Sequence, residues 1–172
     1  ITLNTEAMQQ ALIFYKSLSD KGLIPRDCTY ECNTGRFFAG EFAYALNGDW
    51  AYLETEKALG KDFGVALIPW VGTEAVTPMY STHALVFPGK SLQGSKGEIL
   101  KQFILTMQSE KVQRRWYTVL KRLPVHKKVL AEFKQQADPN QQQFLKQLEF
   151  ARAMPNSPGM SFAWEGMRKG FL

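Results

Sequence analysis

The stretch FFAGEFAYALNGDWAYLE, residues 37–54, combines a strand pattern, a tight turn and two aromatic residues. In the run 42–46, bulky side chains alternate with alanines, which is the period-2 pattern of a strand with one bulky face. The tripeptide NGD (47–49) then turns the chain. Because Trp50 and Tyr52 follow this turn, we expect two exposed rings held side by side and not a pair of core residues.

Two further strands and a series of helices are predicted around this stretch. The run 62–69 (DFGVALIP) is nearly all apolar, as in a strand buried on both faces, and the run 82–88 (THALVFP) predicts a third strand. Helical periodicity and capping residues predict helices over about 5–21, 33–39, 95–108, 109–122, 126–136, 138–151 and 161–172. Strands among helices favour an α/β fold, and three strands are too few for a complete sheet, so we expect part of the sheet outside this chain.

The bulk composition is that of a folded domain. The chain has 172 residues, of which 45% are hydrophobic and 22% charged. No apolar run approaches the roughly 18 residues that a membrane span needs. The first residues show neither an initiator Met nor the pattern of a signal peptide, so we expect a chain that has been processed or shortened.

A net charge of +5 leaves a nucleic-acid binder as one alternative. In the segment 111–128, basic residues are interleaved with Trp116 and Tyr117, which could stack on bases. On a helix, however, Trp116 shares its stripe with Val112 and Val119. We therefore interpret the basic residues as a solvated face and predict no nucleic-acid partner.

Two cysteines, Cys28 and Cys32, form a single C-x3-C pair. This spacing is a weak signal for a metal site, because no second cysteine pair or histidine cluster accompanies it. A short-loop disulfide in an oxidising compartment and two free thiols both remain open. We predict no metal and no cofactor.

Several residues suit the recognition of a carbohydrate, which offers flat C–H patches and a rim of hydroxyls. Trp50 and Tyr52 could stack on the C–H patches, and the neighbouring Asp49 could accept hydroxyl hydrogen bonds. Trp164 and Arg168 are four residues apart on the last predicted helix and so share a face, where Arg168 supplies forked donors. Tyr30, in the loop before a short helix, adds another ring.

An enzyme is the second alternative. Glu41, Asp49 and Glu54 are close in sequence, and a pair of carboxylates could hydrolyse a glycoside. These residues flank a turn without a second segment to supply a partner. We therefore predict a binding protein without catalytic residues.

Four stretches and one helix, taken together in their order along the chain, resemble the extracellular solute-binding proteins of ABC sugar importers, the maltose/maltodextrin-binding family. The stretches are ALIFYKSLSDKGLIP (11–25), FFAGEFAYALNGDWAY (37–52), FGVALIPW (63–70) and AMPNSPGMSFAW (153–164), and the helix is KQFILTMQSEKVQ (101–113). The resemblance covers essentially the whole chain. It implies an α/β fold of the two-lobe, type II periplasmic-binding-protein kind, of which this chain is the C-terminal half because relatives begin about half a chain earlier.

The resemblance also implies lobes and site residues. Residues 1–78 and 138–172 would belong to the C-terminal lobe, and residues 80–136 would return to the N-terminal lobe. The stacking tryptophans of the family fall on Trp50 and Trp164. The other cleft residues fall on Tyr30, Tyr52, Met154 and Arg168. The sequence departs from the pattern at Glu165, where maltodextrin binders would have an aromatic residue.

The function that the resemblance implies is transport. The protein would bind a sugar, oligosaccharide or related polyol in the cleft between the lobes and deliver it to the transmembrane subunits of an ABC permease. It would act as a monomer in the periplasm or outside the cell, with a lipid anchor if a preceding segment carries one.

Overall fold

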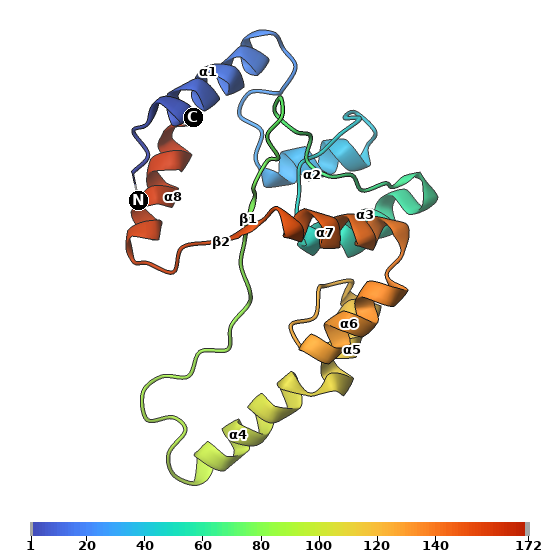
Figure 1. Ribbon diagram of the computed structural model, residues 1–172, viewed down its shortest axis with the longest axis vertical. Helices are drawn as coiled ribbons and strands as arrows, with labels where there is room; N and C mark the ends of the chain where they lie inside the picture. The colour runs from blue at the N-terminus through green and yellow to red at the C-terminus, as the bar shows by residue number, and fades with distance from the viewer. Residues whose placement is uncertain (1, 171–172) are drawn as a thin grey trace. The chain divides into compact units, whose positions relative to one another are not determined.

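The structure is a computed structural model that describes residues 2–170. The chain divides into two compact units (Figure 1). The terminal unit takes Ile1–Ala45 and Met154–Leu172, and the central unit takes Leu46–Ala153. The last two residues of the helix predicted over 161–172 lie outside the described residues.

The terminal unit contains α1 (Glu6–Asp20), α2 (Tyr30–Phe38) and α8 (Gly159–Gly170). The predicted ends of the first helix are confirmed: the Thr5 hydroxyl accepts the Met8 N–H at 3.2 Å, and the chain leaves the helix through Gly22 at φ +67°. The α1 and α8 helices pack on each other. Together with the two residues Leu3 and Asn4 before α1, they line a half-open, mainly apolar pocket of about 230 Å³; its other lining residues are Met8, Leu12, Gly166, Met167 and Gly170.

The central unit begins with η1 (Asp49–Ala51), a short 3-10 helix that runs into α3 (Tyr52–Leu59) and η2 (Gly60–Asp62). An extended stretch leads to β1 (Met79–Tyr80) and to the helical part of the unit. This part consists of α4 (Ser95–Gln108), α5 (Glu110–Leu120), α6 (Lys127–Gln136) and α7 (Pro139–Glu149), and it is followed by β2 (Arg152–Ala153).

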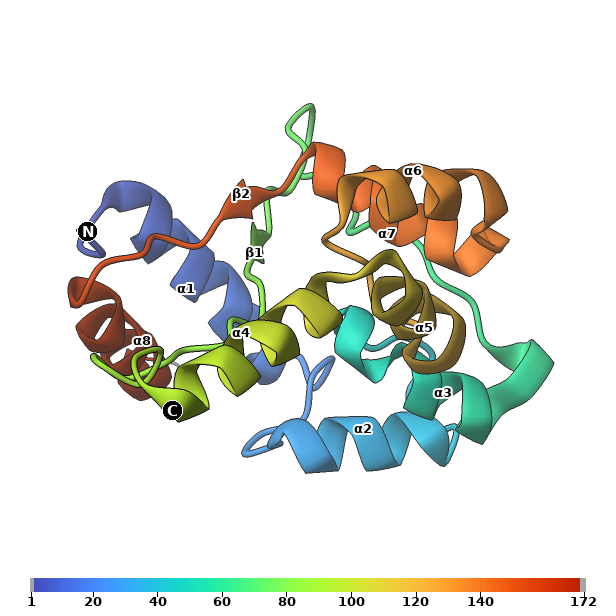
Figure 2. The same ribbon diagram turned by 90° about the horizontal axis from the view of Figure 1, so that it is seen from below.

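The core of the central unit is centred on α6. Val129 and Phe133 are its most completely buried side chains, and the centroid of the Tyr117 ring on α5 lies 5.1 Å from that of the Phe133 ring. The helices α5 and α6 lie side by side (Figure 2). Gln113 is also buried, with its amide fully used: it donates to the Met107 carbonyl and accepts the Val125 N–H, both at 3.0 Å. These bonds satisfy a carbonyl in the last turn of α4 and an N–H in the loop between α5 and α6.

The three predicted strands are wrong in the described residues. No strand forms over 42–46, 62–69 or 82–88. The backbone of 62–69 instead donates to amide side chains of α7, Val65 to Asn140 and Ile68 to Gln147, both at 2.9 Å. A strand needs a neighbouring backbone. In the described chain the paired strands are β1 and β2, which run in parallel with Met79 opposite Arg152 (Figures 1 and 2). An isolated antiparallel bridge also joins Val71 and Glu74.

The helix starts predicted from local capping patterns are confirmed in some cases and wrong in others. Ser109 caps α5, and Asp138 caps α7 with Pro139 at the first helical position, as predicted. The spacing of Ser95 and Glu98 also predicts a capping box at the start of the helix 95–108, and this is wrong: α4 begins after Gly94 without a side-chain cap, and its Glu98 pairs with Lys101. The α2 helix begins at Tyr30, several residues earlier than predicted, because Thr29 provides the cap.

The predicted lobe boundaries near residues 79 and 137 both fall inside the central unit. The boundaries of the two compact units therefore differ from the predicted boundaries of the lobes. The assignment of 1–78, 80–136 and 138–172 to lobes stays a prediction.

Candidate ligand-binding site

Trp50 lies in η1, at the corner where the chain enters α3. Its side chain is 55% exposed, whereas the next two residues, Ala51 and Tyr52, are buried. The corner is fixed by backbone bonds, since Gly48 donates to the Asn47 side chain at 2.9 Å and its carbonyl accepts the Ala51 N–H at 3.1 Å. An exposed indole thus stands on a short segment whose next residues are anchored in the interior.

Tyr52 does not stand beside Trp50 as a second exposed ring, so this part of the expectation is corrected. It is only 2% exposed, and its ring packs edge-on against Phe63 and Phe144, with centroids 5.2 and 6.0 Å away. Its hydroxyl donates to both carboxylate oxygens of Asp138, at 3.1 and 3.0 Å. Burial and the bond to this carboxylate raise the pKa of the Tyr52 phenol. In this structure Tyr52 anchors the corner and offers no face to a ligand.

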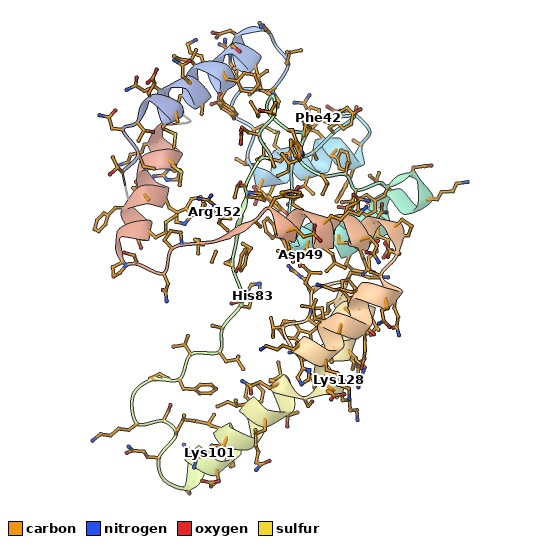
Figure 3. All side chains as sticks on the ribbon, in the orientation of Figure 1. Phe42, Asp49, His83, Lys101, Lys128 and Arg152 are labelled. Carbon is orange, nitrogen blue, oxygen red and sulfur yellow. A yellow bond between two sulfur atoms is a disulfide. The ribbon has the colours of Figure 1, made fainter. Side chains whose placement is uncertain are left out.

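Asp49, labelled in Figure 3, opens η1 and was predicted as an acceptor for a ligand hydroxyl. One of its carboxylate oxygens lies 3.8 Å from the guanidinium of Arg122, and both side chains are about 30% exposed. Nothing in the sequence around Asp49 points to Arg122, which follows α5.

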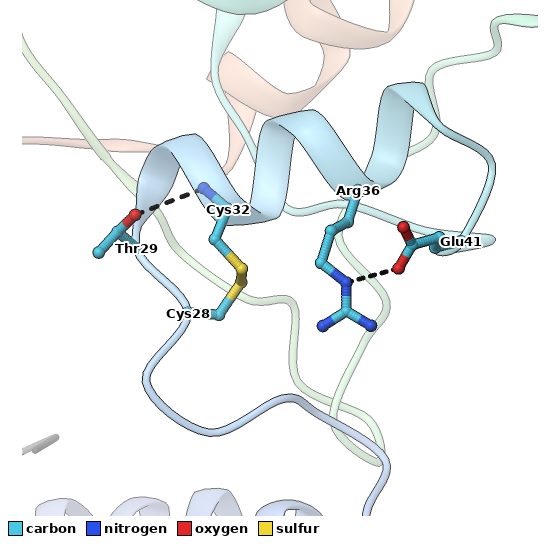
Figure 4. Close-up of a disulfide and its surroundings, with 5 residues drawn as sticks. All are labelled: Cys28, Thr29, Cys32, Arg36 and Glu41. Carbon is cyan, nitrogen blue, oxygen red and sulfur yellow. Dashed lines mark hydrogen bonds and ion pairs between the residues drawn. A yellow bond between two sulfur atoms is a disulfide. The ribbon is translucent and has the colours of Figure 1, made fainter.

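Tyr30 is the first residue of α2, and it is 48% exposed. It lies between Cys28 and Cys32, which are joined by a disulfide with their Cα atoms 5.3 Å apart (Figure 4). The disulfide thus links the residue before the Thr29 cap to the third residue of the helix. Of the two alternatives that the spacing left open, the structure therefore has the disulfide.

Trp164 and Arg168 lie on α8, and Met154 lies before it. Trp164 is 49% exposed, and Met154 is half-buried. The guanidinium of Arg168 pairs with Glu165 at 2.9 Å, and Lys169 pairs with the same carboxylate at 3.2 Å. These two cations hold the pKa of Glu165 below its usual value. The departure noted at Glu165 therefore gives Arg168 an acidic neighbour on its own helix.

The structure thus brings together Asp49 and Trp50 in the central unit and turns Tyr52 away from them. It places Trp164 and Arg168 on one helix of the terminal unit, which also contains Tyr30. The sequence reasoning missed the partners that fix these residues, namely Arg122, Asp138 and Glu165. Of these three partners, only Glu165 could have been predicted from a local pattern, because it lies three residues before Arg168 on the same helix.

Several of the charged residues behind the two alternatives form ion pairs. Glu41 pairs with Arg36 at 2.7 Å, and that guanidinium also lies over the Phe42 ring, 4.4 Å from its centroid. In the basic segment 111–128, Arg114 donates to Glu110 and Glu132 at 2.6 and 2.7 Å. Lys128 and Arg114 together hold the pKa of Glu110 below the usual glutamate value, and Arg114 does the same for Glu132.

Residues 2–170 contain neither a candidate membrane-spanning helix nor a candidate metal-binding cluster. None of their helices combines the length and the apolar character that a membrane crossing requires. Nor do three or more of their His, Cys, Asp and Glu side chains gather in a way that could hold a metal ion.

Residues 2–143 match the family model described as "Bacterial extracellular solute-binding protein". A search of curated proteins found no match. Among solved structures, the maltose-maltodextrin binding protein of the thermoacidophilic bacterium Alicyclobacillus acidocaldarius is similar, with a TM-score of 0.80 and 21% sequence identity. The match covers 99% of this chain and 46% of that one, so the chain spans less than half the length of this structure.

The structural likeness confirms the predicted fold class. The chain has part of an α/β fold of the type II periplasmic-binding-protein kind. The family match extends over most of the chain. The protein belongs to the bacterial extracellular solute-binding proteins.

Proposed function

We propose that this protein is the substrate-binding receptor of an ABC importer and that it carries a sugar or oligosaccharide. The ligand lies in a cleft between the lobes of the fold, where Trp50 and Trp164 stack on its C–H faces. Tyr30, Met154, Asp49 and Arg168 complete the contacts, with the two charged groups directed at hydroxyls. Tyr52 acts behind Trp50 as an anchor.

The observation that supports this proposal most is the exposure of the two tryptophans in a protein that belongs to a family of solute-binding proteins. Tryptophan is highly buried on average, yet Trp50 and Trp164 remain 55% and 49% exposed. Trp50 follows a polar turn, and Trp164 has a charged neighbour in Glu165. Aromatic faces next to groups that can bond hydroxyls are the two elements that a sugar requires.

The proposed mechanism is capture followed by closure. The open receptor binds the ligand on the aromatic residues of one lobe, and the other lobe then closes over it. The ligand favours closure to the extent that it binds the closed state more tightly. The closed, loaded form is recognised by the transmembrane subunits of the permease.

We propose that no bond is made or broken and that no cofactor takes part. Two of the three carboxylates considered for hydrolysis, Glu41 and Asp49, are engaged with Arg36 and Arg122. The proposed location is the periplasm or the exterior of the cell. A disulfide such as Cys28–Cys32 persists in such oxidising compartments, and this supports the location.

The test is sugar binding by the full-length protein and its variants. A thermal-shift screen with maltose, maltotriose, other oligosaccharides and polyols identifies a ligand, and calorimetry then gives the affinity. We expect Trp50→Ala and Trp164→Ala each to weaken binding at least about tenfold, because each removes a stacked ring and the apolar area that it buries.

Trp70→Ala is the matched control. Trp70 is also 55% exposed, but its ring packs edge-on against Phe150 at 6.1 Å and it has no place in the proposed site. Its loss should leave the affinity unchanged. Parent-like binding by both the Trp50 and the Trp164 variant would show that the stacking residues have been misidentified.

A further inference from the structure

Gly48 precedes the corner that carries Trp50, and its backbone conformation does not require glycine. Its φ and ψ of −110° and 177° lie in the ordinary extended region, which any residue adopts. Its N–H and its carbonyl both take part in the bonds that fix the corner. A residue with a side chain could therefore make the same turn as far as the backbone is concerned.

The indole of Trp50 is what excludes a side chain at this position. A Cβ added to Gly48 would lie less than 3.0 Å from Cε3, Cζ3 and Cη2 of Trp50, closer than real Cβ atoms approach. The distances to these three successive ring atoms are nearly equal, so the Cβ position lies over the face of the ring and not beyond its edge. Among the described glycines, only Gly48 meets a side chain at such a distance.

We infer that Gly48 is a positioning residue for ligand stacking. Because it has no side chain, one face of the indole can lie flat on the backbone, and the exposed part of Trp50 is the opposite face. An indole held in this way is oriented before a ligand arrives, and preorganisation lowers the cost of binding. The inference rests on the proposed stacking role of Trp50.

The ring placement can be tested without any ligand. In NMR spectra of the full-length protein, the α-protons of Gly48 should be shifted upfield by the ring current of Trp50, and Trp50→Ala should abolish this shift. Gly48→Ala should move the indole N–H signal of Trp50 and leave those of Trp70, Trp116 and Trp164 in place. Ordinary α-proton shifts for Gly48 in the parent protein would overturn the inference.

The effect on binding is tested by a double-mutant cycle with maltotriose as the probe. Gly48→Ala should weaken binding by about 3- to 10-fold, the range expected for a misplaced aromatic stack. In a Trp50→Phe background it should be neutral, because phenylalanine lacks the outer ring atoms that the new methyl group would meet. An equal loss in both backgrounds, or no loss in the parent, would contradict a positioning role.

Gly35→Ala is the control, since nothing lies within 4 Å of an added Cβ there and its φ is ordinary. This variant should bind like the parent. If Trp50→Ala itself binds like the parent, the proposed function of Trp50 fails, whereas the NMR shifts still decide where its ring lies. If Trp50→Ala loses binding and Gly48→Ala does not, the positioning role alone is wrong.

Discussion

Trp50 in the central unit and Tyr30 in the terminal unit are both exposed rings close to the start of a helix, but they are fixed in different ways. Trp50 is held by packing: its ring lies on Gly48, and the residues that follow it are buried. Tyr30 is held by a covalent link, because the disulfide between Cys28 and Cys32 spans the helix start on which it lies.

The difference shows which conditions each ring depends on. The corner that carries Trp50 depends on the interior of the central unit, through Tyr52 and its contacts with Phe63, Phe144 and Asp138. In α2 only Thr34, its fifth residue, is buried, so the start of this helix depends more on its cap and on the disulfide. A core substitution should therefore disturb the first ring, and a reductant should disturb the second.

The largest effect is expected from Tyr52→Ala. Removing a ring that is 2% exposed leaves a cavity, and such truncations cost about 3–5 kcal/mol in the free energy of unfolding. Chemical denaturation measures this loss. Hydrogen exchange should show faster exchange of the α3 amides, while the α2 amides exchange as in the parent.

Two further variants sharpen this test. Tyr52→Phe keeps the ring and loses only the bond to Asp138, so about 1 kcal/mol should be lost. Tyr44→Ala should have almost no effect on stability, because Tyr44 is 91% exposed. Parent-like stability of Tyr52→Ala would mean that the corner is not anchored through this ring.

The second effect in size is expected from loss of the disulfide. The double variant Cys28→Ser/Cys32→Ser should lose about 2 kcal/mol, the chain-entropy value for so short a loop. Hydrogen exchange should now be faster at the first turn of α2 and unchanged in α3, which is the reverse of the pattern for Tyr52→Ala. Dithiothreitol should reproduce the effect in the parent protein and add nothing in the variant. Equal loss of protection in both helices would contradict the separate dependence of the two rings.

The comparison also shows what could be predicted from the sequence. Helix starts at Thr5, Ser109 and Asp138 were predicted because a cap and its partner are within three residues of each other. The exposure of Trp50 was predicted from the polar turn before it, which is equally local. The family resemblance gave the fold class, which the chain's own strands do not reveal.

The failures concern partners that are distant in the sequence. Tyr52 was predicted as exposed, and this was wrong. Its hydrogen-bond acceptor, Asp138, is 86 residues away, so no local pattern could show that the side chain is buried. The apolar run 62–69 has the composition of a strand, but its backbone bonds go to α7, which no local pattern could show. Gly48 is a different case: it was interpreted only as a turn residue, and its contact with a ring two residues later needed coordinates.

The smallest effect is expected at Glu31, the second residue of α2. Its own backbone N–H and the Thr29 hydroxyl hold the pKa of its carboxyl below the ordinary value of 4.5. Since the pKa is lower in the folded state, the carboxylate stabilises the folded protein above the unfolded-state pKa, and this contribution is lost as the pH falls through the folded-state pKa. The free energy of unfolding of the parent should therefore exceed that of Glu31→Gln at pH 7, and the gap should close in acid.

Denaturation of both proteins between pH 7 and acidic pH measures this gap, and NMR titration of the Glu31 carboxyl measures its pKa. Thr29→Ala removes one of the two donors, so it should return the pKa of Glu31 toward 4.5 and narrow the gap at neutral pH. A gap that stays the same from pH 7 into acid would contradict a stabilising role of the Glu31 carboxylate at the start of α2.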